Sequence, residues 1–370
     1  MKKVFLTTIA LLSMASATIF GMYGPDSDWI TFLTDGNRFR ARADQLGFTL
    51  GNDTIKGTFG FNNNAGYGGV YGSLFSTANG ITYDFKPSIS MGLGYTSSLI
   101  SVGVGYNATI GTDYKGGGKS YNTVAHTPVL VLNAMDNAFR MAIPIQVVSI
   151  NDKTSEGIKQ NLTATKLNSE FRYYTGNDIL TQVRLYFNYA YFSMKNGSAE
   201  TKYETLGFDF RLYFGAIVED VELEPFIKIV YDTSLNKHLP TDYLNFDIIE
   251  NLKSEGSFSQ AVLEAGQYTA GRNDFDKNAW KLTLMPALGL SASSDIVSLY
   301  LEPSLGLDIA GALNNGDKDT YSLAWNVYGE ISLTPIQNLE WYFEAELGDN
   351  ADETEKVLNF NATTGITWYF

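Results

Sequence analysis

The chain has 370 residues and a formal net charge of −14, with no cysteine and two histidines. Without cysteine it has no disulfide framework, thiolate metal site or lipid-modified cysteine, and the acidic balance argues against nucleic acid as a partner, since phosphate binding needs clustered Lys and Arg. Its 35 Gly, 23 Tyr and 23 Phe with only 9 Pro favour strands joined by turns.

The first residues have the pattern of a secretory signal peptide. Lys2–Lys3 precede the apolar run Val4–Leu12, and Ala15–Ala17 and Gly21 offer cleavage sites. The apolar run is too short to span a bilayer as a helix. We therefore expect residues 1–21 to be removed during export.

The first strand pattern lies in residues 44–61, but its phase breaks. Its apolar residues are even-numbered up to Leu50 and odd-numbered from Ile55, so Gly51–Asn52 is either a bulge or a tight turn. Upstream, Trp29–Leu33 could form an extra strand or a short periplasmic helix.

From residue 83 onward, apolar and polar residues alternate in long segments. Such alternation places one face of a strand in an apolar environment. The segments exceed the usual five or six residues of a soluble strand and match the nine to eleven of a transmembrane strand. The clearest are 83–95, 181–191, 205–214, 280–290, 297–309 and 339–347.

Short and long breaks between these segments alternate, as in outer-membrane barrels. We therefore predict an all-β fold: a transmembrane antiparallel up-and-down β-barrel of about fourteen strands, with sixteen as the alternative, short periplasmic turns and long extracellular loops. Residues 22–43 are then an N-terminal periplasmic segment and 44–370 the barrel. The longest loop, 232–278, is acidic and either folds into the lumen or stands outside.

Charged residues on the polar faces are predicted to line the lumen, with basic residues on one wall and acidic residues on the wall that closes the barrel. Asp84, Glu170 and Asp209 weaken this contrast. The charges either border an aqueous pore or pair and fill a narrow barrel. The basic set is Arg140, Arg172, Arg184, Arg211 and Lys228; the acidic set is Glu302, Asp308, Glu330, Glu340, Glu344 and Glu346.

The sequence offers no site for catalysis. Of the two histidines, His126 lies at a loop–strand junction and His238 in the longest loop, and neither has the neighbours of a triad or a metal site. We expect no enzyme activity, metal or cofactor; a barrel enzyme that uses one of the two histidines is the third alternative.

The segment GITWYF, residues 365–370, ends the last alternating strand. Ile366, Trp368 and Phe370 are predicted to face lipid, with Trp368 in the aromatic girdle. This pattern is similar to the assembly signal that the outer-membrane insertion machinery reads.

The N-terminal stretch GMYGPDSDWITFLTDGNRFRARADQLGFTLGNDTIKGTFGFNNN (residues 21–64) and the leader MKKVFLTTIALLSMASA resemble the variable surface proteins of intestinal spirochaetes. The resemblance is sharpest over residues 1–64. It implies an abundant outer-membrane antigen whose loops differ between paralogues, which occurs in large assemblies and is cleaved after Gly21. The family implies no catalytic residues.

These observations predict a surface-exposed barrel of the bacterial outer membrane, a variable surface antigen with a porin-like charged lumen. The alternative is a non-channel adhesin or structural surface-layer barrel that acts through its loops. The expected partners are outer-membrane lipid, the barrel-insertion machinery, further copies or paralogues in an oligomer, and host ligands or antibodies.

Overall fold

The computed structural model of the chain describes residue 23 and residues 28–42, 45–63, 87–110, 114–116, 119–121, 124–153, 159–196, 199–218, 221–237, 241, 244, 275–349 and 358–370. Within this part of the chain the structure is almost entirely β-strand, with the short 3-10 helix η1 (Asp28–Thr31) near its start. The predicted signal peptide lies outside the described residues, as does most of the predicted loop 232–278; Asp232 to Ser234 belong to a strand.

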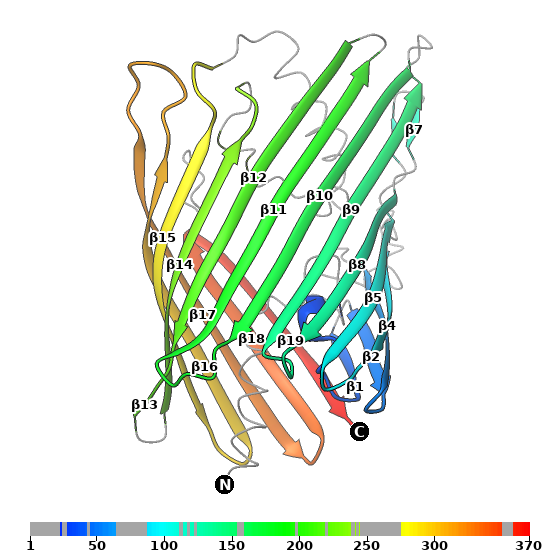
Figure 1. Ribbon diagram of the computed structural model, residues 1–370, viewed down its shortest axis with the longest axis vertical. Helices are drawn as coiled ribbons and strands as arrows, with labels where there is room; N and C mark the ends of the chain where they lie inside the picture. The colour runs from blue at the N-terminus through cyan, green and yellow to red at the C-terminus, as the bar shows by residue number, and fades with distance from the viewer. Residues whose placement is uncertain are drawn as a thin grey trace, which may run out of the picture.

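The strands form one closed antiparallel sheet (Figure 1). Each strand pairs with the next one along the chain, and pairing of β19 with β1 closes the ring. The segments β12 and β13 pair with β14 in the same register and form one interrupted strand, so the 17 described strands of this sheet make a barrel of 16. They are β1 Arg38–Arg42, β2 Gln45–Gly51, β3 Ile55–Asn63, β4 Pro87–Tyr95, β5 Ile100–Ile110, β8 Val124–Ala134, β9 Phe139–Lys153, β10 Lys159–Tyr174, β11 Leu180–Asn196, β12 Ala199–Phe214, β13 Ala216–Val218, β14 Val221–Ser234, β15 Trp280–Ser293, β16 Val297–Ala310, β17 Thr320–Ile336, β18 Leu339–Asp349 and β19 Leu358–Tyr369. Between β5 and β8, β6 (Tyr114–Gly116) and β7 (Lys119–Tyr121) form a small separate hairpin.

The strand number corrects the first prediction of about fourteen and agrees with the alternative of sixteen. Residues 44–61 contain two strands because Asn52 makes a tight turn, in which its Oδ1 accepts hydrogen bonds from the backbone N–H groups of Thr54 (2.9 Å) and Ile55 (2.8 Å). The other additional strand is β1, which pairs with both β2 and β19.

Because of strand β1, the barrel begins earlier in the chain than predicted. The sequence placed residues 22–43 outside the barrel, but Arg38–Arg42 is part of the closed sheet, so the barrel begins at Arg38 rather than at residue 44. The extra strand is not Trp29–Leu33, whose residues form η1 and the turn that follows it.

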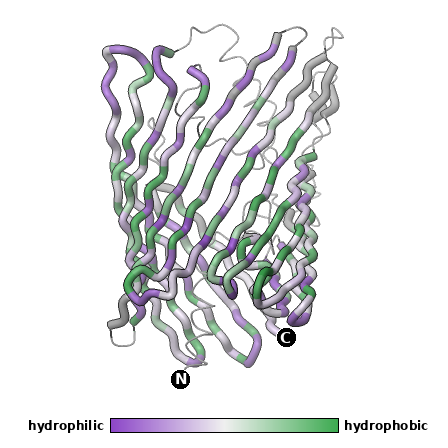
Figure 2. Tube along the Cα trace, viewed as in Figure 1, coloured by the Kyte–Doolittle hydropathy of each residue, from purple (hydrophilic) through white to green (hydrophobic). Residues whose placement is uncertain are grey.

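Side chains alternate between the two faces of the wall as predicted. On β16, Leu301 and Leu305 point outward and are 43% and 57% exposed, whereas Tyr300 and Asp308 point inward and are 9% and 6% exposed. Figure 2 shows this alternation as a change of colour along the strands. A closed sheet with an apolar outer face can span a membrane because closure leaves no unpaired edge in lipid.

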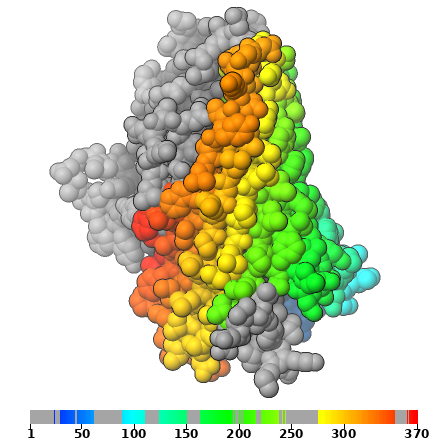
Figure 3. Space-filling view, turned by 90° about the vertical axis from the view of Figure 1, so that its left-hand side faces the viewer, coloured from blue at the N-terminus to red at the C-terminus, as the bar shows by residue number. Residues whose placement is uncertain are grey.

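The wall is much taller on one side than on the other (Figure 1). Strands β9–β12 have 15, 16, 17 and 16 residues, whereas β1, β2 and β3 have 5, 7 and 9. Spanning needs about nine to eleven residues, so the tall strands rise beyond the membrane at the loop end. There, exposed Glu200 binds Lys195 (3.6 Å) and Lys202 (3.5 Å). Figure 3 shows the side of the barrel that lies at the left of Figure 1, where the yellow and orange segments of β15–β17 adjoin the green strands in a continuous surface.

Candidate functional site: the charged inner wall

The five predicted basic residues lie side by side on the inner face, near the short turns. The register pairs Arg140 with Arg172, Arg172 with Arg184, Arg184 with Arg211 and Arg211 with Lys228, across β9, β10, β11, β12 and β14. We call these residues the basic row. Because like charges opposite one another destabilise a sheet, the row needs groups that offset its charge.

Two carboxylates offset part of this charge. Glu170 Oε1 lies 2.5 Å from Arg172 Nε, and Asp209 Oδ2 lies 2.6 Å from Arg211 Nη2 and 3.9 Å from Lys228 Nζ. Each carboxylate is two residues before its arginine on the same strand and therefore on the same face. Glu170 and Asp209, which weaken the predicted contrast between a basic and an acidic wall, are therefore the ion-pair partners of the basic row.

Tyrosine rings support three of the guanidinium groups, including that of Arg211. Each ring lies on a neighbouring strand and faces an arginine at a distance at which cation–π attraction operates. The pairs are Arg140 with Tyr174 (4.7 Å), Arg184 with Tyr213 (4.4 Å) and Arg211 with Tyr186 (4.7 Å). The row is therefore a packed part of the wall, with its charges held in place.

The six predicted acidic residues also face inward, on β16, β17 and β18. Each is bonded to another side chain of the wall, although Glu330 and Glu344 lie directly opposite one another. The bonds are Glu302 to Tyr300 (2.5 Å), Asp308 to Lys281 (2.9 Å), Glu330 to Tyr328 (3.0 Å), Glu340 to Tyr369 (3.4 Å), Glu344 to Arg42 (2.8 Å) and Glu346 to Asn326 (2.8 Å).

Three arginines that the sequence analysis left outside the barrel stand beside this acidic wall. Arg38, Arg40 and Arg42 alternate on β1, and all three point inward. Arg40 and Arg42 each lie 5.0 Å from the ring centre of Tyr342, and Arg40 Nε donates to the Thr367 hydroxyl (3.3 Å). The alternation of RFRAR is the signal in the sequence that indicates this strand, although the stretch lies within the predicted periplasmic segment 22–43.

The residues before β1 fold back against the inner wall. We call residues 23 and 28–37 the inner segment. Its side chains Tyr23, Trp29, Ile30, Phe32 and Leu33 are buried together with inward-facing residues of β8 and β9. The segment thus occupies the short-turn end of the lumen on the low side of the barrel (Figure 1).

Glycines on β4 and β5 make room for this segment. A Cβ on Gly92 would lie 2.6 Å from the Trp29 ring, and one on Gly103 would lie 3.1 Å from Leu33 Cδ2. Gly92 pairs with Gly105 and Gly94 with Gly103, so the four glycines form one patch. In MGLGY and VGVGY these glycines alternate with larger apolar residues, and the contacts with the inner segment give the reason for their small size.

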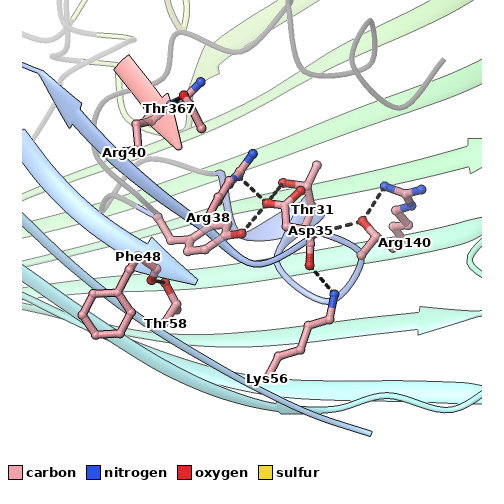
Figure 4. Close-up of polar contacts among 11 residues, drawn as sticks. Thr31, Asp35, Arg38, Arg40, Phe48, Lys56, Thr58, Arg140 and Thr367 are labelled. Atoms are coloured by element: carbon pink, nitrogen blue, oxygen red, sulfur yellow. Dashed lines mark hydrogen bonds and ion pairs between the residues drawn. The ribbon is translucent and has the colours of Figure 1, made fainter. Parts of the chain in front are cut away.

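Asp35 fixes the inner segment through polar contacts (Figure 4). Its carboxylate accepts hydrogen bonds from the hydroxyls of Tyr23 and Thr31 and from Arg38 Nη2 (2.5 Å), and its backbone carbonyl accepts one from Lys56 Nζ. Burial, and then the Asp35 charge, raise the pKa of the Tyr23 hydroxyl, which therefore stays protonated as a donor.

The inner segment also contacts the basic row. Arg140 Nη1 donates to the Thr34 hydroxyl over 3.1 Å (Figure 4). Around the barrel, the inner face therefore passes from the inner segment at β4–β9 to the basic row at β9–β14 and the acidic wall at β16–β18. On β1, which follows the acidic wall around the ring, Arg38 binds Asp35 of the inner segment.

The other sequence candidates lie on the outside of the wall or beyond the described residues. His126 is exposed on β8, where its Nδ1 lies 2.5 Å from the Tyr106 hydroxyl, and His238 is not among the described residues. No group of three or more His, Asp and Glu residues in the described ranges is placed to hold a metal ion. In the same ranges, no helix is long and apolar enough to cross a membrane.

The three residues predicted as an assembly signal lie on the outer face at the closing strand. Ile366, Trp368 and Phe370 are 42%, 41% and 58% exposed. The backbone N–H of Phe370 donates to the carbonyl of Asn37 (3.2 Å), at the seam with β1.

The model of the Serpulina hyodysenteriae variable surface protein family matches residues 2–369. The chain belongs to this family. The resemblance seen in the sequence is thereby confirmed. With its closed membrane-spanning barrel, this member of the variable surface protein family is a surface protein of the bacterial outer membrane.

No curated protein sequence matches the chain. Among solved structures, it is similar to CdiB from Acinetobacter baumannii (10% identity, TM-score 0.43), covering 90% of this chain and 59% of that one. It is also similar to a bacterial polysaccharide outer membrane secretin (8%, TM-score 0.46; 90% and 97%). A third similar structure is a loop L8 deletion mutant of OmpT, an outer membrane protein of Vibrio cholerae (10%, TM-score 0.36; 90% and 97%).

Proposed function

We propose that this variable surface protein forms a water-filled channel for small polar solutes and presents its taller wall and loops as a surface antigen. The observation that carries the channel is the inner face of a closed sixteen-stranded barrel, which bears the basic row on β9–β14 and a group of carboxylates on β16–β18. Barrels of this size are wide enough for an aqueous passage. Arg211, Lys228 and Glu346 are only partly buried on this face, and charged groups are stable where water reaches them.

The inner segment narrows this passage without removing the charged walls from it. It packs on β4, β5, β8 and β9, whereas the basic row continues to β14 and the acidic residues lie on β16–β18. If short turns face the periplasm, as is general for such barrels, the narrow part is at the periplasmic end.

Conductance of the folded protein in planar lipid bilayers tests the channel. We expect stepwise currents from protein that shows the heat-dependent mobility shift of a folded barrel. Protein that inserts in this folded form and never conducts would contradict the proposal. The matched control is heat-denatured protein from the same preparation.

A non-channel role at the surface is the second candidate, and the polar extension of β9–β12 favours it. Glu200 binds Lys195 and Lys202 beyond the length needed to span lipid. Antibodies raised against the folded protein on intact cells should lose binding when both lysines become Ala. The inward-facing Lys56, bonded to Asp35, provides the control position. Protein that binds surface ligands without conducting would favour an adhesin or structural barrel.

We also propose the remaining sequence-based assignments: no catalytic role, assembly through the insertion machinery, and association with further copies or paralogues. The absence of a catalytic role is supported by His126, which lies on the outer face away from the charged inner wall. A search for activity on protein or lipid substrates with wild type and His126→Ala tests it. Activity that disappears with His126 would contradict it.

A further inference from the structure

Three buried donor groups, one in the basic row and two next to it, have no hydrogen-bond partner within the described part of the chain. They are Arg172 Nη1, Gln182 Nε2 and the Tyr213 hydroxyl. Their residues are 4%, 3% and 1% exposed. A buried donor without an acceptor costs free energy, so three in one place indicate that something else supplies the acceptor oxygens.

These donors are neighbours on the same face of the sheet. Gln182 on β11 pairs with Tyr174 on β10 and with Tyr213 on β12. This polar row lies one inward-facing step from the basic row, since side chains two residues apart share a face. Strands about 4.8 Å apart thus place amide, hydroxyl and guanidinium donors next to one another on the inner face.

The positive charge of the basic row is concentrated at its β9–β11 end. Lys228 and Arg211 share Asp209, and the charges of Glu302 and Asp308 also act on Lys228. At the β9–β11 end, Arg140, Arg172 and Arg184 are near three carboxylates. Glu170 is bonded to Arg172, Glu224 interacts with Arg184, and Asp35, which acts on Arg140, is already paired with Arg38. An anion is therefore favoured where the unpartnered donors lie.

We propose that this region of β10–β12 is an anion-binding site for solutes that carry a phosphate or carboxylate group. A guanidinium group donates two parallel hydrogen bonds to such oxygens, and the Gln182 amide and Tyr213 hydroxyl add further donors. The inference rests on the proposed channel only for the route by which a solute arrives. In a chain of formal charge −14, attraction of an anion depends on these local cations.

Inorganic phosphate binding to the folded protein in detergent tests the site by isothermal titration calorimetry. Tyr213→Phe removes the hydroxyl and keeps the ring that faces Arg184, so the barrel should fold. We expect this variant to bind phosphate about tenfold more weakly, and Gln182→Leu to weaken binding similarly. Tyr328→Phe removes an inward tyrosine hydroxyl on the acidic wall and should leave phosphate binding unchanged.

Succinate in place of phosphate distinguishes the two oxyanion groups, and glucose serves as the uncharged control. Folded wild-type protein that binds neither anion would overturn the proposal, as would equal affinities of wild type, Tyr213→Phe and Gln182→Leu. Phosphate binding without bilayer conductance would contradict the proposed channel but support the anion-binding site. Conductance without anion binding would contradict the anion-binding site but support the channel.

Discussion

Trp29 occupies the space in which a side chain on Gly105 would lie. A Cβ built on Gly105 would be 2.5 Å from the Trp29 ring carbons Cη2 and Cζ3. A contact that short cannot persist, so a larger residue at this position has to displace the indole. Docking of the inner segment therefore depends on the absence of a side chain at Gly105.

Gly105→Leu should therefore release the inner segment and widen the lumen. We expect a folded barrel with a larger single-channel conductance and with Trp29 more accessible to acrylamide, measured by fluorescence quenching. Gly57→Leu is the matched control, because the nearest atoms to a Cβ there are 3.9 Å away. Equal conductance and quenching in Gly105→Leu and wild type would show that the segment does not restrict the lumen.

The acidic wall allows a comparison of two neighbouring inward carboxylates. Glu344 is 9% exposed and bonded to Arg42 at 2.8 Å, whereas Glu346 accepts a hydrogen bond from the neutral Asn326. Glu344→Lys should destabilise the barrel by about 3–5 kcal/mol, because it leaves two buried cations together. Glu346→Lys should keep most of the stability and shift the channel toward anions.

Urea unfolding in lipid vesicles measures the stability difference, and the reversal potential in a salt gradient measures the selectivity. Equal free energies of unfolding for the two variants would contradict the role of the Arg42 pair. A reversal potential that does not change in Glu346→Lys would place this carboxylate away from the ion path.

The sequence was sufficient to predict the parts of the fold that depend on local alternation. Leu301 and Glu302 were assigned to opposite faces correctly, because a strand alternates faces whatever its partner is. The phase break at Gly51–Asn52 marked a real turn. Strand β1 was missed because its five residues are too few for a clear pattern and its pairing with β19 links opposite ends of the sequence.

The candidate site was only partly predictable for a related reason. Alternation indicates that Arg172 and Arg184 face inward, but the register between strands decides that they lie opposite one another. The unpartnered Gln182 and Tyr213 donors depend on the positions of side chains from three strands, which no local pattern contains. The inner segment depends on contacts between residues before β1 and glycines of β4 and β5.

The two faces of β16 should respond differently to the same substitution. Leu305 is 57% exposed on the outer face, and its neighbour Ser304 faces inward, where its hydroxyl donates to the Asn326 carbonyl (3.1 Å). Leu305→Arg should cost about 2–4 kcal/mol if the position is near the bilayer midplane. Ser304→Arg should cost about 1 kcal/mol from the lost hydrogen bond. Urea unfolding in vesicles compares them, and a larger cost for Ser304→Arg would reverse the assignment of faces.

Phe370 should affect assembly of the barrel more than its stability. Its side chain is 58% exposed on the outer face, and its bond to the Asn37 carbonyl uses the backbone N–H, which substitution retains. Phe370→Ala should therefore change the free energy of unfolding by no more than about 1 kcal/mol. If the insertion machinery reads this side chain, surface display in cells should fall while unassembled periplasmic protein accumulates.

Ile336→Ala provides the matched control, since Ile336 is an outward residue of similar exposure (55%) at the short-turn end of β17. Quantitative surface labelling, together with unfolding of the purified variants, separates the two effects. Normal display of Phe370→Ala would show that the side chain is not part of an assembly signal. Equal loss of display in both variants would show that any outward apolar residue at this level suffices, and that β19 has no special role.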